Sequence, residues 1–365
     1  MPQLSLTFSL AEQSFSWTRS IGLLNLSMGM LEHVARRPEV GKVTLLSNDT
    51  FAGALNLPAN VETLIHNEAN GRGLSRMFWD QWKVYSAAKD AGNEWLFMPK
   101  GFVSFLRKCP VKLTAYVPDV VFDHYERNYP GKFSKLEVLY LKQSIKAALR
   151  QSKVIFTCSE FTNSELTRVA QKWGITPPPL VAIGTGFTRK LKLDVPKDDR
   201  IVVLASPFAH KRTDLALKYL ERWCKETSFQ GRVDWVGGFE KGVSLPKLPN
   251  WQLHQRVPEK EFREMVARAR ALVYFTEYEG FGMPPVEAII AGTCSVYSDI
   301  PCTFEVMQGM GAPFKNESYE SFAQALETAM KTSPEQLDAW TNKLLERHNW
   351  DVGAEKIVKA LLAAK

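Results

Sequence analysis

Short apolar runs alternate along the chain with longer segments in which apolar residues recur every three or four positions. This alternation predicts an α/β fold of parallel strands joined by crossover helices. In the first half, we expect strands at Leu4–Ser9, Lys42–Leu46, Glu62–Ile65, Trp95–Met98, Lys112–Tyr116, Val154–Thr157 and Leu180–Ile183. We expect helices at Ser20–Arg37, Phe78–Asp90, Lys132–Gln151 and Glu160–Lys172.

A second series of strands and helices follows the charged stretch Arg189–Arg200, which reads as an interdomain linker. Its expected strands are Ile201–Ala205, Val233–Val236, Gln252–His254, Ala271–Phe275 and Ser295–Tyr297. Its expected helices are Lys211–Thr227, Glu259–Arg270, Pro284–Ala291, Ser318–Met330, Pro334–Arg347 and Val352–Ala364. Two doubly wound units in tandem place ligands at the carboxyl ends of their strands, in the cleft between domains.

Length and cysteine content narrow the class of protein. A chain of 365 residues fits two domains better than one core. Its five cysteines are scattered without a C-x-x-C pair, which argues against a disulfide framework or a zinc site and favours a reducing compartment. The longest apolar runs fall far short of the roughly 20 residues that span a bilayer. We therefore expect a cytoplasmic protein, soluble or peripheral on the inner face of the cytoplasmic membrane.

The net charge of +7 is unevenly distributed. Between Arg127 and Lys153 there are seven basic residues and one acid, Glu137, so the rest of the chain is close to neutral and nucleic-acid binding is not expected. Segment 132–153 has two interpretations: an interfacial helix on an anionic membrane, or an ordinary helix with a solvated basic face. Its basic side is Lys135, Lys142, Lys146, Arg150 and Lys153, and its apolar stripe is Val138, Leu141, Ile145 and Ala148.

The most informative segment runs from Glu277 to Gly292, EYEGFGMPPVEAIIAG, directly after the apolar run Ala271–Phe275. Gly280 and Gly282 permit a tight turn that brings backbone close to a ligand. The two prolines suit the first positions of a helix, and the final glycine suits its end. A strand, a glycine turn and a helix N-terminus with exposed amides form a ready site for a diphosphate.

Two acids, Glu279 and Glu287, flank this anion site. We expect Glu279 in the turn and Glu287 on the first turn of the helix. Phosphate repels a carboxylate, but a carboxylate accepts hydrogen bonds from vicinal hydroxyls. The pattern therefore suggests a ligand with hydroxyls on both sides of a diphosphate, the shape of a nucleotide sugar. In the alternative, Glu287 interacts with the helix dipole and Glu279 is solvated; the glycines and prolines favour the ligand site.

Residues 279–292, EGFGMPPVEAIIAG, resemble the E-x7-E signature of the large retaining glycosyltransferase family four, which has the GT-B architecture. Residues 298–306 resemble that family's next segment, S-D-x-P-x-x-x-E-V. Two further matches are residues 210–217, similar to its basic element before the donor domain's first long helix, and residues 156–166, similar to the acceptor-domain run I-T-V-S-E-F-S-x-x-E-L. The C-terminal matches are the more specific.

This resemblance implies an α/β GT-B fold with two Rossmann-like domains facing a central cleft. The expected parts are an acceptor-side domain, a donor-binding domain and a C-terminal helix that crosses back to the first domain. Their boundaries are residues 1–190, 191–345 and 346–365.

The resemblance also implies roles for individual residues. Glu279 contacts hydroxyls of the transferred sugar, and Glu287 contacts the ribose. Lys211 neutralises the diphosphate and stabilises the leaving group. The backbone that meets the sugar and phosphates is that of Gly280, Phe281, Gly282 and Met283.

The chain departs from the family pattern beside Lys211. Many members carry an arginine there, whereas this chain has His210 and Arg212 as neighbours. We assign the second cation to Arg212, with His210 as the alternative. Gly22 lies where such enzymes bring a backbone turn near the phosphates, although a turn glycine without a ligand is an equal interpretation.

A second departure lies in the first domain. Many members have His-Asp after the strand that ends near Tyr116, and this chain has Pro118-Asp119. Asp119 matches the acid and is assigned to the catalytic group, while the histidine has no counterpart. Nearby His124 is expected to lie in a loop.

The predicted reaction is hexose transfer with retention at the anomeric carbon, in which the departing phosphate takes the acceptor's proton. No D-x-D motif occurs, and we expect no required metal or cofactor. GDP-mannose is the first donor expected and UDP-hexoses are next, with a glycan, lipid-linked or other glycoconjugate acceptor in polysaccharide biosynthesis. The alternatives are a nucleotide-sugar epimerase and a non-catalytic module that binds nucleotide sugar or glycan.

Overall fold

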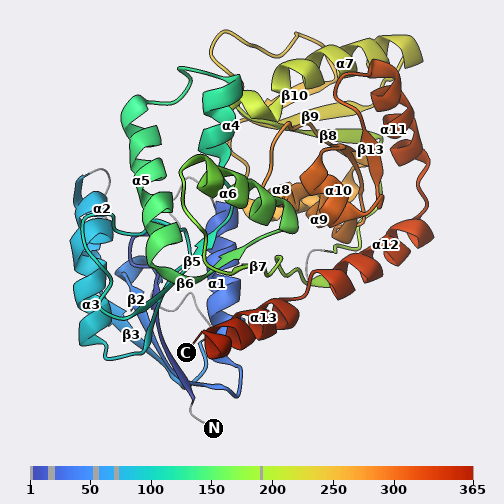
Figure 1. Cartoon of the computed structure of the whole chain (residues 1–365). Coiled ribbons are helices and arrows are strands. Elements are labelled where there is room, and N and C mark those ends of the chain that lie inside the picture. Colours follow the sequence, from blue (N-terminus) through green and yellow to red (C-terminus); the bar gives the residue numbers. More distant parts are fainter. Residues whose placement is uncertain (1–2, 15–20, 52–56, 70–73, 190–191, 365) are drawn as a thin grey trace. The chain divides into compact units, whose positions relative to one another are not determined.

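The computed structural model describes residues 3–14, 21–51, 57–69, 74–189 and 192–364. The chain forms two compact units, residues 1–186 with residues 349–365, and residues 187–348 (Figure 1). Each unit is built on its own parallel sheet.

The described residues of the first unit form a seven-stranded sheet in the order β3-β2-β1-β4-β5-β6-β7. Neighbouring strands pair in parallel throughout. The order reverses between β1 and β4, which is the switch point of a doubly wound fold. The strands are β1 Leu4–Ser9, β2 Val40–Ser47, β3 Val61–Ile65, β4 Trp95–Met98, β5 Lys112–Val117, β6 Ser152–Thr157 and β7 Leu180–Ala182.

Helices connect these strands, and their apolar sides build the core of the first unit. Trp79, Tyr85, Ile155 and Leu166 are among the side chains that lie fully buried there. The helices are α1 Ile21–Ala35, α2 Leu74–Phe78, α3 Val84–Asp90, α4 Val121–Asn128, α5 Lys135–Gln151 and α6 Glu160–Lys172, with a π-helical segment at Trp79–Lys83.

The C-terminal helix α13, Trp350–Ala363, packs against α1 within the first unit (Figure 1). The ring of Trp350 lies against two glycines, Gly29 and Gly186, where a larger residue would not fit. A Cβ at Gly29 would lie 2.4 Å from its ring, and a Cβ at Gly186 would lie 2.1 Å from it. His33 on α1 adds a hydrogen-bond contact between its Nδ1 and the carboxylate of Asp351 at 2.8 Å.

The second unit has a six-stranded parallel sheet among its described residues, in the order β10-β9-β8-β11-β12-β13. The strands are β8 Arg200–Ala205, β9 Arg232–Gly237, β10 Trp251–His254, β11 Ala271–Tyr274, β12 Cys294–Ser298 and β13 Ala312–Phe314. The helices are α7 Thr213–Thr227, α8 Glu259–Arg268, α9 Met283–Ile290, α10 Pro301–Met307, α11 Tyr319–Lys331 and α12 Pro334–Arg347. This sheet and that of the first unit confirm the predicted α/β fold.

An aromatic cluster supports the carboxyl end of β11. The ring of Phe275 lies 4.5 Å from that of Phe314 and 5.3 Å from that of Phe322, and all three are buried. Such packing fixes the point at which the chain leaves the sheet. The turn that follows β11 is therefore held on a rigid base.

Four elements show clear differences from the sequence-based expectations. Residues 121–128 form helix α4, so His124 is a buried helical residue and not a loop histidine. Strand β13 and helix α10 were not predicted, because each is short and lacks a long apolar period. Helix α5 begins at Lys135, three residues after its predicted start, with Ser134 as its N-cap.

Candidate functional site

The second unit brings together the segments that the sequence singled out. Strand β11 ends at Tyr274, a turn follows, and α9 begins at Met283. Gly282 has φ +79°, a left-handed conformation that glycine adopts without strain, and Gly292 with φ +86° follows the other end of α9. The predicted strand, glycine turn and short helix are all present.

Glu279 lies in this turn, as expected, and its carboxylate is the centre of a polar cluster. Lys211 forms an ion pair with Oε1 of Glu279. Tyr274 also donates a hydrogen bond to this oxygen, and Thr276 donates one at 2.9 Å. Among the described residues, none donates a hydrogen bond to Oε2, so this oxygen is available to accept from a ligand.

The charge of Glu279 is stabilised although the side chain is largely buried, with 14% of it exposed. Burial acts to raise the pKa of Glu279. The positive charge of Lys211 and the hydrogen bonds from Lys211 and Tyr274 outweigh burial and hold the pKa below its usual value. Glu279 is therefore a carboxylate at neutral pH, which suits a hydrogen-bond acceptor.

Lys211 ends a short 3₁₀ segment, Ala209–Lys211, directly before α7. Its ammonium donates to the hydroxyl of Tyr274 at 2.9 Å and lies 5.2 Å from the centre of that ring. From the sequence, Lys211 and Glu279 were expected to contact separate parts of one ligand. In the structure, these two side chains also contact each other directly.

Arg212, next to Lys211, has φ +42° and forms ion pairs with Glu277 and, at 3.4 Å, with Asp214. Its guanidinium is therefore held by carboxylates of the same unit. His210 is buried, and its carbonyl accepts a hydrogen bond from the amide of Glu277 at 2.7 Å. Both residues thus fix the shape of the segment that presents Lys211.

Glu287 is the fifth residue of α9, so the expectation that it lies on the first helical turn is wrong. The helix begins at Met283, which leaves Glu287 in the second turn. Burial, together with the charge of Glu259, raises the pKa of Glu287 to about 7. Within the part of the chain that is described, its carboxylate has no hydrogen-bond donor.

The start of α9 offers free backbone donors. The amides of Phe281, Gly282 and Met283 donate to no acceptor among the described residues. Such amides at a helix start attract an anion. Phe281 itself is buried, with its ring edge-on to that of His348 at 5.1 Å, which anchors the turn.

A buried polar network that the sequence reading did not identify supports the turn from beneath. Ser298 donates to Asn316 at 2.7 Å, and Asn316 donates to the carbonyl of Thr276 at 2.9 Å. The amide of Thr276 donates back to Ser298 at 2.9 Å. In the sequence, the S-D-x-P motif pointed to Ser298 as a residue of interest. No motif pointed to Asn316.

Thr303 connects the same segment to the glycine turn. Its hydroxyl donates to the carbonyl of Ser298 at 2.6 Å. Its methyl group would lie 3.3 Å from a Cβ at Gly282. The close approach of Thr303 is a second reason for glycine at this position.

Asp119 and Gly22 belong to the first unit. Asp119 follows β5, and its carboxylate accepts a hydrogen bond from the amide of Val121 at 2.9 Å, which helps to start α4. Gly22 is the second residue of α1. The turn expected around Gly22 falls on residues 15–20, outside the described residues.

No group of three or more His, Cys, Asp or Glu side chains in the described ranges could hold a metal ion. The expectation of a metal-independent reaction stays a prediction. Likewise, none of the helices within these ranges is long and apolar enough to cross a membrane.

Part of the chain is similar to known glycosyltransferases. Residues 190–346 match the family model described as glycosyl transferases group 1, so this region carries a domain of that type. The matched region contains the Lys211–Glu279 pair and all of α9.

A curated relative is the O-antigen chain mannosyltransferase RfbU of Salmonella typhimurium, 24% identical over 233 residues. That alignment covers 61% of this chain and 63% of the relative, so the chain spans less than two thirds of its length. This likeness agrees with the glycosyl transferases group 1 domain matched at residues 190–346.

Solved structures are similar over the full chain. Sucrose-phosphate synthase from Thermosynechococcus elongatus has a TM-score of 0.71 at 14% identity, with 100% of each chain covered. Anabaena HepE, solved in complex with UDP and glucose, has a TM-score of 0.67 at 13% identity, with 99% of this chain and 100% of that chain covered. These likenesses confirm the GT-B fold.

Proposed function

We propose that this protein is a retaining glycosyltransferase that moves a hexose from a nucleotide-sugar donor to a glycan, lipid-linked or other glycoconjugate acceptor in polysaccharide biosynthesis. The observation that carries the proposal is the contact of Lys211 with Glu279 beside the free amides at the start of α9. A cation, a carboxylate and an anion-binding helix start are the groups that a sugar joined to a diphosphate requires.

In this proposal the donor diphosphate binds at the amides of Phe281, Gly282 and Met283. Lys211 exchanges part of its contact with Glu279 for the diphosphate and stabilises the negative charge that develops on the leaving phosphate. The free oxygen of Glu279 accepts hydrogen bonds from sugar hydroxyls. The departing phosphate takes the proton of the acceptor hydroxyl, and the new bond forms on the face that the phosphate leaves.

Asp119, Arg212, Glu287 and Gly22 complete the proposed set. Glu287 accepts from the ribose hydroxyls, and Arg212 contributes positive charge once a phosphate competes with Glu277. Asp119 and Gly22 contribute from the first unit. We propose GDP-mannose as the donor, because a chain mannosyltransferase is among the relatives, with UDP-hexoses as the next candidates. No metal is required in this scheme.

The proposal includes a peripheral contact of residues 132–153 with an anionic membrane, where a lipid-linked acceptor would lie. It also places the protein in the cytoplasm, where nucleotide sugars are available.

The decisive variant is Glu279→Ala, with exposed Glu320→Ala on α11 as its control. Consumption of GDP-mannose and UDP-glucose is measured with and without a membrane lipid extract as acceptor source. We expect Glu279→Ala to abolish transfer while GDP or UDP still raises its melting temperature, because ligand binding stabilises the native state. Unchanged turnover in this variant would refute the assignment.

The same assay separates the alternatives. Donor conversion that needs no acceptor would indicate an epimerase, and donor binding without any conversion would indicate a non-catalytic module. Product of the donor's own anomeric configuration, read by NMR, is the result expected for retention.

A further inference from the structure

The outward side of α5 carries leucines and cations on one narrow stripe. At about 100° per residue, its five members fall within an arc of about 100° of the helix. Leu136 is 77% exposed and Leu139 is 52% exposed, so neither contributes to the core. The stripe consists of Lys135, Leu136, Leu139, Lys146 and Arg150.

This stripe is distinct from the apolar stripe predicted for the helix. Ile145 and Ala148 of the predicted stripe are buried in the core of the first unit. That side therefore faces the core, as the apolar side of a packed helix does. The interpretation of α5 as an ordinary packed helix therefore explains its buried side. It does not explain the exposed leucines on the opposite side.

The cations of the stripe are not neutralised by nearby acids. Lys135 and Arg150 form no ion pair with a described residue, and Lys146 lies 5.0 Å from the ring centre of Trp173. Lys142, by contrast, pairs with Glu126 and lies at the edge of the stripe. The one acid of the helix window, Glu137, lies about 150° from the centre of the stripe.

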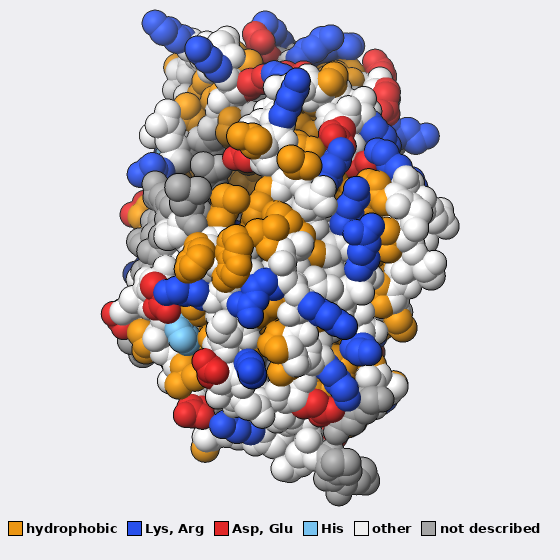
Figure 2. All heavy atoms as spheres, turned by 60° about the vertical axis from the view of Figure 1, so that its left-hand side comes forward, with side chains coloured by type: hydrophobic (Ala, Val, Ile, Leu, Met, Phe, Trp, Pro, Cys, Tyr) orange, Lys and Arg blue, Asp and Glu red, His pale blue; other side chains and the backbone are white. Residues whose placement is uncertain are grey.

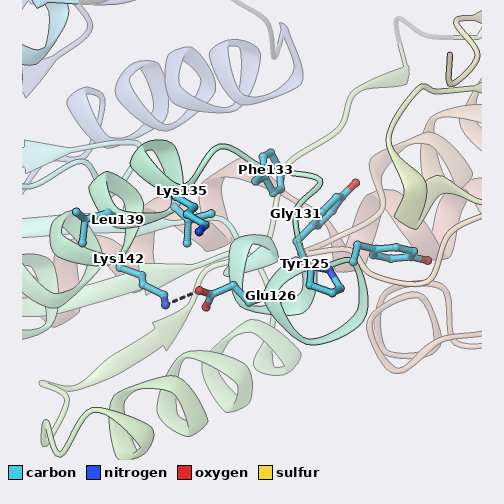
Figure 3. Close-up of a pocket in the computed structure, with 10 residues that line it drawn as sticks. Tyr125, Glu126, Gly131, Phe133, Lys135, Leu139 and Lys142 are labelled. Carbon is cyan, nitrogen blue, oxygen red and sulfur yellow. Dashed lines mark hydrogen bonds and ion pairs between the residues drawn. The ribbon is translucent and has the colours of Figure 1, made fainter.

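A cavity of about 480 Å³ adjoins the stripe, between α5 and the chain that follows α4 (Figure 3). Aromatic side chains, Tyr125, Tyr129 and Phe133, form much of its wall. Leu139 and Lys135 of the stripe also line it, and the Lys142–Glu126 ion pair forms a polar part of the wall. Its size lies within the range of pockets that hold a small ligand. Figure 2, which brings this side forward, shows apolar side chains gathered beside several basic ones.

We propose that the stripe and the adjoining cavity form a docking surface for an anionic lipid bilayer. Leu136 and Leu139 enter the interface, the three cations meet lipid phosphates, and the cavity takes one acyl chain. Apolar side chains interleaved with lysine and arginine are the pattern that binds the headgroup region of anionic membranes. A protein partner fits less well, because lysine is depleted from the cores of protein interfaces.

The inference assigns individual residues and a cavity to the membrane contact of residues 132–153 that the proposed function includes, and it rests on that function for its purpose, which is to bring the enzyme to a lipid-linked acceptor. Its test needs no sugar donor and uses the full chain. Co-sedimentation is measured with vesicles of phosphatidylcholine alone and of phosphatidylcholine with phosphatidylglycerol, at low and high salt. We expect binding to the anionic vesicles alone, weakened by salt.

Two double variants separate the contributions of charge and of apolar contact. Lys135→Gln with Arg150→Gln should weaken binding to anionic vesicles on the order of tenfold or more, because each cation near such a surface contributes to the attraction. Leu136→Ser with Leu139→Ser should weaken binding to the anionic vesicles at high salt as well as at low salt, because the lost contact is apolar. The matched controls are Lys218→Gln with Lys343→Gln, and the exposed Phe304→Ser, all in the second unit.

Several outcomes would overturn the docking proposal. These are wild-type protein that ignores anionic vesicles, controls that lose as much binding as the stripe variants, or a dimer in solution that the leucine variant dissociates. Thermal stabilisation by GDP or UDP is measured on the same samples. A chain that binds vesicles but neither nucleotide would count against the donor site and leave the docking surface intact.

Discussion

Glu279 and Glu287 share one motif but have different surroundings. Glu279 accepts hydrogen bonds from Tyr274 and Thr276 and pairs with Lys211, which keep it ionised. Glu287 has no hydrogen-bond donor within the described part of the chain, and burial followed by the charge of Glu259 raises its pKa to about 7. The first acid is organised before any ligand arrives, whereas the second gains its partners from the ligand in our proposal.

This difference predicts the behaviour of Glu287→Gln. A carboxylate accepts hydrogen bonds from two ribose hydroxyls, and an amide offers one acceptor oxygen. The variant should bind GDP or UDP on the order of tenfold more weakly, the effect of one charge-assisted hydrogen bond. Isothermal titration measures this, with inorganic pyrophosphate as the matched ligand that lacks ribose and should bind both proteins equally.

The same residue gives the wild-type protein a pH dependence. Because the pKa of Glu287 is about 7, protonation removes the acceptor as pH falls below that value, and nucleotide affinity should decline. Glu287→Gln should lack this decline. Equal loss of pyrophosphate binding in the variant would show a general disturbance of the site and contradict the ribose assignment.

Residue identities were readable from the sequence, but their contacts were not. The motif placed Glu279 in the turn, and resemblance added Lys211 from a distant segment. Nothing in the pattern showed that Lys211 and Glu279 would touch, or that Arg212 would be held by Glu277. Such pairings depend on how two loops meet after the sheet has formed.

At the scale of elements, α9 is defined by a glycine at each end. Gly282 has φ +79° and would bring a Cβ within 3.3 Å of Thr303, whereas Gly292 has φ +86° and open space around it. Both positions favour glycine for backbone reasons. Only Gly282 adjoins the amides proposed to bind the diphosphate.

Alanine at the two positions should therefore separate stability from binding. Gly282→Ala and Gly292→Ala should each destabilise the protein by about 1 kcal/mol, because alanine is strained at positive φ. Only Gly282→Ala should weaken GDP or UDP binding as well. Urea unfolding and calorimetric titration of both variants test this, and an equal loss of affinity in Gly292→Ala would contradict the placement of the diphosphate.

Sequence-based prediction of elements succeeded where the apolar pattern was clear and failed where buried polar residues interrupted it. Helices α6 and α12 and strands β1 and β4 have the predicted bounds, since each shows a clear apolar pattern. Helix α4 was missed, because its buried face includes Asp123 and His124. The burial of Asp123 depends on cations such as Arg168 and Lys172, which no local pattern reveals.

At the scale of the whole molecule, His348 gives folding a pH dependence. Burial lowers the pKa of His348 to about 4 and outweighs the hydrogen bond to the carbonyl of Val306 at 3.1 Å, which acts to raise the pKa. In the unfolded chain its pKa is about 6.5. The unfolded state thus binds more protons between these values, so this contribution to stability is present above about pH 6.5 and is lost as pH falls toward 4.

His348→Gln keeps an N–H donor but cannot titrate in this range. The stability of the wild type relative to this variant should fall by about 2 kcal/mol between about pH 7.5 and about pH 5. Urea unfolding at the two pH values measures the difference. Parallel pH profiles for the two proteins would show that His348 is not buried in its neutral form.

The sequence by itself determined the periodicity of strands and helices, the glycine and proline boundaries of α9, and the acids and cations available for chemistry. These follow from local physics, because propensity, capping and apolar period act over a few residues. The tertiary structure alone decided that Lys211 meets Glu279, that Asn316 supports the turn, and that Leu136 and Leu139 remain exposed. These facts depend on contacts between residues far apart in the chain, which are set only when packing selects one arrangement of the elements.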